Sequence, residues 1–333
     1  MADNSTEATF DAKSCTIETC PIETSYYEYR PSLAANVALP AIFAASFIGF
    51  ALTKVFTRRS RGLFFTIALL LGLAAEIVGY IGRVMSYNDP WESTGFMIQI
   101  CCLTIAPAFI SAGIYVSLRP IIAAFGHHNS RIPSRWYTRI FIPCDVVSLI
   151  LQGTGGGLAA AGDDKATTDN GTDIMIAGLV FQVVTLLVFI GLCVDFSIST
   201  FRNFKVNGST ALNDDPAVVN IRRSVMFRGF LAALALSTTC VFIRCVYRVA
   251  ELSEGWTGPI MAREDLFIAF EGGLISVAVL VLNVFNPIIC CGSLLDPQTQ
   301  KGLKVSDGEY SMKSLSDGRV LTADVIESPQ LPS

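Results

Sequence analysis

Arg244, Arg248 and Glu251 are the residues of this sequence most able to do chemistry, because they belong to a stretch that otherwise reads as a membrane span. The segment RCVYRVAE that contains them directly follows the apolar run GFLAALALSTTCVFI. Spacings of four and three residues place the three side chains on one face of a helix. A charge within a membrane is costly unless it is paired, so these groups either bind a charged ligand or neutralise one another.

Other polar residues are predicted at the same depth, in the outer half of the membrane. They are Glu76 and Arg83 in the second apolar segment, Gln99 at the start of the third and Glu271 in the last. The whole set contains three acids (Glu76, Glu251, Glu271) and three bases (Arg83, Arg244, Arg248). Such a balance predicts a neutral ion network that joins spans two, six and seven. Alternatively, a ligand with a charged head group exchanges for one arm of the network.

Asp145 differs from these residues because no base is predicted in a span at its depth, the inner third of the fourth span. Arg139, at the membrane boundary, could still reach it with its long side chain. Gln152 lies seven residues further along the same face. The candidate substrate-binding residues are Asp145, Gln152, Glu76, Glu271 and Gln99. The run that follows, Gly153-Thr-Gly-Gly-Gly157, favours close packing between helices through Gly153 and Gly157. The alternative is a loosened helix whose carbonyl groups face a substrate path.

These residues must be positioned by membrane helices. The chain has 333 residues, of which 52% are hydrophobic and only 16% are charged, whereas soluble domains carry about 25% charged residues. Apolar runs of about 20 residues, the length that crosses a bilayer, occur at 33–55, 62–85, 95–118, 140–161, 174–201, 224–246 and 266–290. We therefore predict an all-α integral membrane protein with seven transmembrane helices.

Lysine and arginine are concentrated in the loops that follow the odd-numbered spans. Those loops hold twelve of them, against three in the other loops. Cytoplasmic loops carry such an excess, which predicts an N-terminus outside and a C-terminus in the cytoplasm. Residues 1–32 are then an extracellular tail, 33–292 the transmembrane domain and 293–333 a cytoplasmic tail whose polar composition predicts disorder.

Two features of the predicted outer side concern covalent modification. Asn4 and Asn170 begin glycosylation acceptor sequences. Cys15 and Cys20, also outside, either form a disulfide or stay free. The other cysteines lie in spans or at their ends, where cysteine behaves as a small apolar residue.

Missing motifs narrow the function. The sequence has no nucleotide-binding motif, and its two histidines are adjacent in a loop, which argues against ATP as the energy source and against a zinc hydrolase. The last span has no lysine for a retinal Schiff base, and no Asp/Glu-Arg-Tyr motif of a G-protein-coupled receptor ends the third. We therefore expect neither an enzyme nor a cofactor or metal site, and no nucleic acid partner.

An ordered series of motifs resembles one family, the fungal lipid-translocating exporters, also called RTA-like proteins. The motifs are Glu76-Ile-Val-Gly-Tyr-Ile-Gly-Arg83, Gln99 with Ala106-Pro107, Ala112 with Tyr115, Asp145 with Gln152-Gly-Thr-Gly155, Arg244-Cys-Val-Tyr-Arg-Val-Ala-Glu251 with Gly255, and the acids Glu264 and Glu271. Glu271 stands where the family would have aspartate, and Asn286 stands where histidine would precede Pro287. The resemblance covers about 33–292.

The resemblance implies export or transbilayer movement of amphipathic lipids, with sphingoid long-chain bases or related cationic toxicants as substrates and membrane lipids as partners. It also implies a role in resistance, at the plasma membrane or at a vacuolar or other endomembrane. The alternative is a seven-span, receptor-like sensor of membrane stress that transports nothing itself. In a translocator, an ammonium group would meet Asp145 first and Glu76 or Glu271 later, while the lipid tail slides between helices kinked at Pro107 and Pro287. Tyr115 and Tyr247 are predicted to anchor their helices at opposite membrane interfaces.

Overall fold

The computed structural model describes residues 15, 17–57, 62–126, 129–162, 164–208, 212, 216–255, 258–292 and 294, and the side chains of all of these except 216 and 217. The predicted acceptor Asn4 and, apart from Leu294, the predicted tail 293–333 lie outside the described residues. Within them the chain is helical. Its long helices are α1 (Leu33–Thr57), α2 (Leu63–Asn88), α3 (Ser93–Phe125), α4 (Ser134–Ala161), α5 (Lys165–Asn207) and α7 (Val225–Ser253). The last stretch contains α8 (Glu264–Leu266), the π-helix η5 (Phe267–Gly273), α9 (Leu274–Val284) and α10 (Pro287–Cys290).

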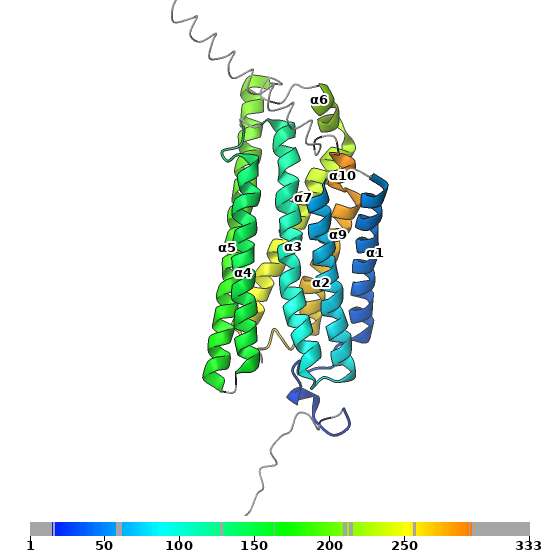
Figure 1. Cartoon of the computed structure of the whole chain (residues 1–333), viewed down its shortest axis with the longest axis vertical. Helices are drawn as coiled ribbons and strands as arrows, with labels where there is room; N and C mark the ends of the chain where they lie inside the picture. Colours follow the sequence, from blue (N-terminus) through cyan, green and yellow to red (C-terminus); the bar gives the residue numbers. More distant parts are fainter. Residues whose placement is uncertain are drawn as a thin grey trace, which may run out of the picture.

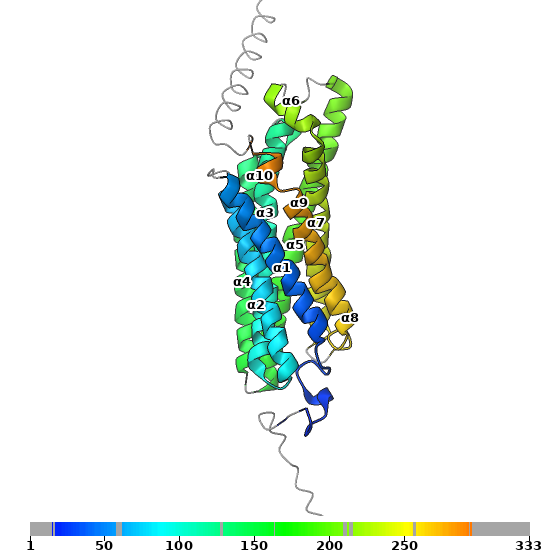
Figure 2. The same cartoon turned by 90° about the vertical axis from the view of Figure 1, so that its right-hand side faces the viewer.

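Seven helices of the described chain are long and apolar enough to cross a membrane, which confirms the predicted fold class. They run alongside one another in one elongated bundle (Figures 1 and 2). Large apolar side chains such as Ile48, Ile150 and Leu187 are exposed on its sides, as expected of surfaces that face lipid tails. α5 extends beyond the predicted span 174–201, to Lys165 at one end and Asn207 at the other. Its extra turns are polar, so hydropathy alone does not detect them.

α4 and α5 form a tightly packed hairpin at the left-hand edge of the bundle in Figure 1. Glycine lets their backbones touch: a Cβ atom built on Gly155 would lie 2.6 Å from the carbonyl oxygen of Gly171, and one on Gly178 would lie 2.9 Å from that of Ser148. Gly153 and Gly157, predicted to be the packing pair, have no atom within 4 Å of such a Cβ. The packing role was therefore predicted correctly and assigned to the wrong face.

The last span is not one regular helix. A π-helical turn includes Glu271, and such turns are frequent at functional sites. Further along, α9 ends at Val284, and α10 restarts after Asn286, whose side chain accepts a hydrogen bond from the Ile288 amide at 3.0 Å. The interruption predicted at Pro287 is thus present. α3, in contrast, continues as a helix through Pro107.

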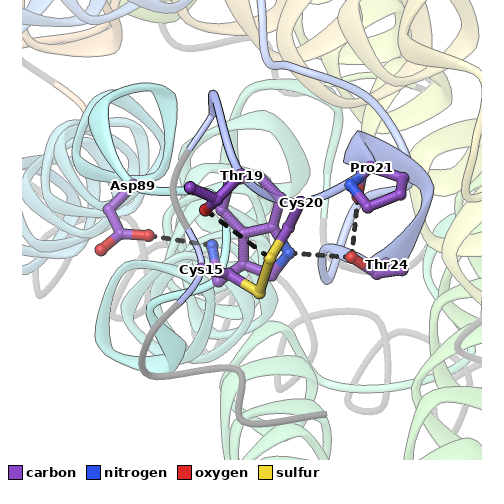
Figure 3. The surroundings of a disulfide bond; sticks show 7 residues. Cys15, Thr19, Cys20, Pro21, Thr24 and Asp89 are labelled. Carbon is purple, nitrogen blue, oxygen red and sulfur yellow. Dashed lines mark hydrogen bonds between the residues drawn. A yellow bond between two sulfur atoms is a disulfide. The ribbon is translucent and has the colours of Figure 1, made fainter. Parts of the chain in front are cut away.

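The chain before α1 packs against the bundle as an N-terminal cap, which we define as residues 17–32 together with Cys15. The cap includes the 3-10 helix η2 (Ile22–Thr24) and lies at the lower end of the bundle in Figure 1, here called the cap end. A disulfide joins Cys15 to Cys20, and Figure 3 shows it beside Asp89, just after α2. The Trp91 indole donates a hydrogen bond to Thr24 Oγ1 at 3.1 Å. The described part of the predicted tail is therefore an ordered part of the fold.

Candidate functional site

Arg244 is the centre of a fully buried ion cluster formed by α2, α7 and η5. Its Nη2 atom lies 2.6 Å from Glu271 Oε1 and 3.4 Å from Glu76 Oε1, and it also donates to the Leu103 carbonyl oxygen of α3 at 2.6 Å. None of the three charged side chains is exposed. One guanidinium group therefore serves two carboxylates and a helix carbonyl, and connects the spans that the sequence predicted to be joined.

Arg248 and Glu251 form a second pair one turn further along α7. Arg248 Nη1 donates to Glu251 Oε2, and its Nε atom lies 4.0 Å from Glu271 Oε1. Tyr247 donates a hydrogen bond to Glu251 at 3.3 Å and stacks on Phe270. Tyr247 is buried, so its predicted role as an anchor at the membrane surface is wrong: the helix turns it toward the last span.

Arg83 lies apart from these pairs and is fully buried. Its guanidinium group donates to Asn36 Oδ1 at 2.8 Å and to the Tyr29 hydroxyl at 2.6 Å, and stacks over the Phe267 ring at 3.9 Å. Its acidic partner is Glu264, 3.3 Å away and 21% exposed. The network therefore contains four acids and three bases. The fourth acid, Glu264, is partly exposed to solvent.

Gln99, a predicted substrate residue, is occupied by the cap. Its side-chain oxygen accepts a hydrogen bond from the Tyr27 hydroxyl at 2.6 Å and a longer one from Arg83 at 3.4 Å. Asn36, Tyr27 and Tyr29 are therefore members of the polar cluster that the sequence analysis missed. The two tyrosines lie before the first apolar run, where hydropathy gives no sign that a residue is buried.

The buried Tyr27 gives the cap a pH dependence. Burial raises its pKa to about 12 from the usual 10.0 of a tyrosine, against the lowering effect of Arg83. Since only the neutral phenol fits, the free energy of cap docking is constant below pH 10 and falls by about 1.4 kcal/mol per pH unit between pH 10 and 12. An ultraviolet difference titration of the wild type against Tyr27→Phe should show one phenol that ionises near pH 12. Ionisation of that phenol at pH 10 would mean that the cap is not docked.

Asp145 remains without a charged partner. It is 3% exposed, and among the described residues no ion pair reaches either carboxyl oxygen. Arg139 makes no ion pair with it, so the predicted long reach is wrong: the Arg139 side chain is exposed. The groups that face Asp145 are the Tyr115 hydroxyl of α3 and the Cys245 thiol of α7. Tyr115 was predicted to lie at the membrane interface, yet it is fully buried.

Gln152 lies on the same buried stripe of α4 as Asp145 but contacts different partners. Its amide donates to Ser148 Oγ at 2.5 Å and to Gln182 Oε1 of α5 at 3.0 Å. Ser148 in turn donates to the Gly178 carbonyl oxygen at 2.8 Å. These bonds join α4 to α5 through the amide nitrogen, whereas the side-chain oxygen of Gln152 is buried and has no hydrogen-bond partner among the described residues. A contact between Gln152 and a substrate therefore stays a prediction. Asn170, the second predicted glycosylation acceptor, is exposed on α5 near the cap end.

Two cavities lie between the α4–α5 hairpin and the other helices. The larger, about 700 Å³, is almost wholly apolar and is lined by α3, α5 and α7, with Ile114, Phe189 and Thr238 among its residues. The smaller, about 530 Å³, lies at the cap end between Tyr26, Trp91 and Phe96 on one side and Gly156 and Ala159 of α4 on the other.

Asp145 lines neither cavity itself, but its neighbours connect it to both. Phe189 lines the larger cavity and packs against Tyr115, with ring centroids 4.6 Å apart, and Tyr115 faces Asp145. On the other side, the buried stripe of α4 continues through Gln152 to Gly156 at the smaller cavity. No cluster of three or more histidine, cysteine or acidic residues in the described chain is placed to hold a metal ion.

Comparison with known proteins identifies the family of this chain. A family model described as RTA1 like protein matches residues 69–293. The chain belongs to the RTA1-like family. This match spans every helix that contributes to the Arg244 cluster and to the Asp145 interface, and confirms the resemblance drawn from the motifs.

Curated relatives come from the yeast Saccharomyces cerevisiae. The sphingoid long-chain base transporter RSB1 is 30% identical over 279 residues, covering 77% of this chain and 72% of the relative. Protein RTM1 is 32% identical over 236 residues, covering 68% and 71%, and protoporphyrin uptake protein 1 is 25% identical over 315 residues, covering 80% and 96%. No solved structure matches this chain. Two of these relatives are therefore named for moving a small molecule across a membrane.

Proposed function

We propose that this protein moves cationic amphipathic lipids, of the sphingoid long-chain base class, from one leaflet of a membrane to the other. The observation that carries the proposal is Asp145, a buried carboxyl group with no cation facing it in the described chain. An unpaired carboxylate within a membrane is expensive and is retained for function. The named activity of the relative RSB1 supports the same substrate class.

The two parts of such a lipid need different surroundings. The apolar cavity of about 700 Å³, between α5 and α7, suits an alkyl tail, and the adjacent Asp145 suits an ammonium group. Glu76 and Glu271, the other predicted substrate carboxylates, are held by Arg244. We therefore assign the head group to Asp145 and a structural role to the Arg244 cluster. Export at the plasma membrane is what the family resemblance implies.

The proposal is tested by lipid movement in liposomes that contain the purified protein. Fluorescent analogues with cationic, neutral and anionic head groups are compared, and the Asp145→Asn variant is expected to move the cationic analogue at least 10-fold more slowly, because the amide removes the charge and keeps the shape. Asp195→Asn is the matched control, since Asp195 pairs with Arg131 on the exposed surface of the hairpin. Faster movement of the anionic analogue would contradict the assignment. Liposomes in which no analogue moves would favour the sensor.

A further inference from the structure

The surroundings of Asp145 leave its charge to be balanced by something that is not part of the protein. Tyr115 from α3 and Cys245 from α7 are the titratable groups that face it. From α5, Phe189 packs against Tyr115 and Phe141. Within the described chain, then, no cationic side chain faces the carboxyl group. A low-dielectric interior does not tolerate an isolated ionised carboxylate, so an empty site takes up a proton.

We propose that Asp145 binds a proton and the cationic head group of the substrate in turn, so that the protein exchanges one organic cation for one proton. This inference rests on the proposed function and adds its energy source. With neither cation bound, the interior holds one uncompensated negative charge, and with both bound it holds one positive charge. Both states are costly, so the populated states hold one cation each.

The exchange balances in atoms and charge. When the ammonium group reaches Asp145, the carboxylic acid releases its proton to water on the side from which the lipid came. When the lipid leaves on the other side, the carboxylate takes a proton from water there. No net charge crosses the membrane. On one side, Phe189 of the larger cavity packs against Tyr115, which faces Asp145, and on the other the buried stripe of α4 runs from Asp145 through Gln152 to Gly156 at the smaller cavity.

The Arg244 cluster does not offer a second exchange site of this kind. Its two carboxylates share a guanidinium group that is itself enclosed, at 2.6 Å from Glu271 and 3.4 Å from Glu76. Cys245, the residue after Arg244, lies within electrostatic range of both Asp145 and Glu271. The cluster therefore fixes the position of the helix that faces Asp145, and each of its two carboxylates already has Arg244 as a cationic partner.

A permanently charged probe separates this exchange from passive movement. The N,N,N-trimethyl analogue of a long-chain base has no ammonium proton to lose, so it cannot carry protons across the membrane as a neutral amine. It is added to liposomes that contain the whole protein and a trapped pH-sensitive dye, with the membrane potential clamped. For the wild type we expect the lumen to become alkaline as the probe enters, with about one proton per probe.

Three variants locate the exchange. Asp145→Asn should lose both proton movement and probe movement at least 10-fold, whereas Asp145→Glu, which keeps a titratable carboxyl group, should retain both. Asp195→Asn should match the wild type. Probe movement by the wild type without proton movement overturns the exchange and leaves the proposed function standing. Proton movement that persists in Asp145→Asn moves the exchange to another residue. A wild type that moves no probe overturns the proposed function and the exchange with it.

Discussion

Replacement of Arg244 by methionine is expected to lower the free energy of unfolding by about 3–5 kcal/mol, because it removes one partner of a buried ion cluster. The Glu76 and Glu271 carboxylates, both fully buried, would then face each other without their shared cation. The Leu103 carbonyl oxygen would lose its side-chain donor as well. Methionine fills a similar volume, so the loss would reflect charge and not a cavity.

Denaturation of the protein in lipid bicelles measures this effect. Arg228→Met is the matched control, since Arg228 is exposed on the same helix. Its free energy of unfolding should stay within about 0.5 kcal/mol of that of the wild type. Adding Glu76→Gln and Glu271→Gln to Arg244→Met should recover most of the loss, because a neutral interior replaces an uncompensated one. If Arg244→Met proves as stable as Arg228→Met, the cluster does not hold the spans together.

The sequence predicted which residues belong to the ion network better than it predicted their partners. Arg244, Glu76 and Glu271 could be grouped because charges in a membrane must be compensated at their own depth. The partner of Arg83 could not be chosen in this way, because Glu264 is 181 residues away and begins the last span, where a solvent-exposed acid is equally reasonable. The hydrogen bond between Tyr29 and Arg83 could not be predicted, since no feature of the sequence around Tyr29 indicates that its side chain is buried.

Helix rotation explains the other errors. Burial of the Tyr115 side chain was not predicted, because a position along a span does not say whether a side chain faces lipid or a neighbouring helix. The same ambiguity affects the glycine-rich run of α4, where glycines lie on more than one face. Only the contact with α5 selects Gly155 over Gly153 and Gly157. Seven spans follow from hydropathy alone, whereas the face each helix turns to its neighbours depends on side chains far away in sequence.

Replacement of Gly155 by leucine should separate α4 from α5 and destabilise the protein by about 3 kcal/mol, at the upper end of the usual range for inserted side chains. The neighbouring atoms belong to the backbone of α5: the Gly171 carbonyl oxygen would lie 2.6 Å from the first added carbon, and the Met175 Cα atom 2.9 Å from it. Backbone atoms of a helix cannot move aside as a flexible side chain can. The helices themselves must therefore move apart.

Gly153→Leu is a matched control for Gly155→Leu, because it adds the same atoms two residues away to a face that is open to the surroundings. Leucine has a better helix propensity than glycine, so Gly153→Leu should be neutral or stabilising by up to about 1 kcal/mol in bicelle denaturation. Equal midpoints for the two variants would mean that α4 packs through another face.

Transport of the cationic lipid should be slower in Gly155→Leu than in Gly153→Leu, since the hairpin holds Asp145 and lines both cavities. If folded Gly155→Leu protein moves the cationic lipid at the wild-type rate, the path does not depend on the spacing of the hairpin, and the head-group site must be sought away from Asp145.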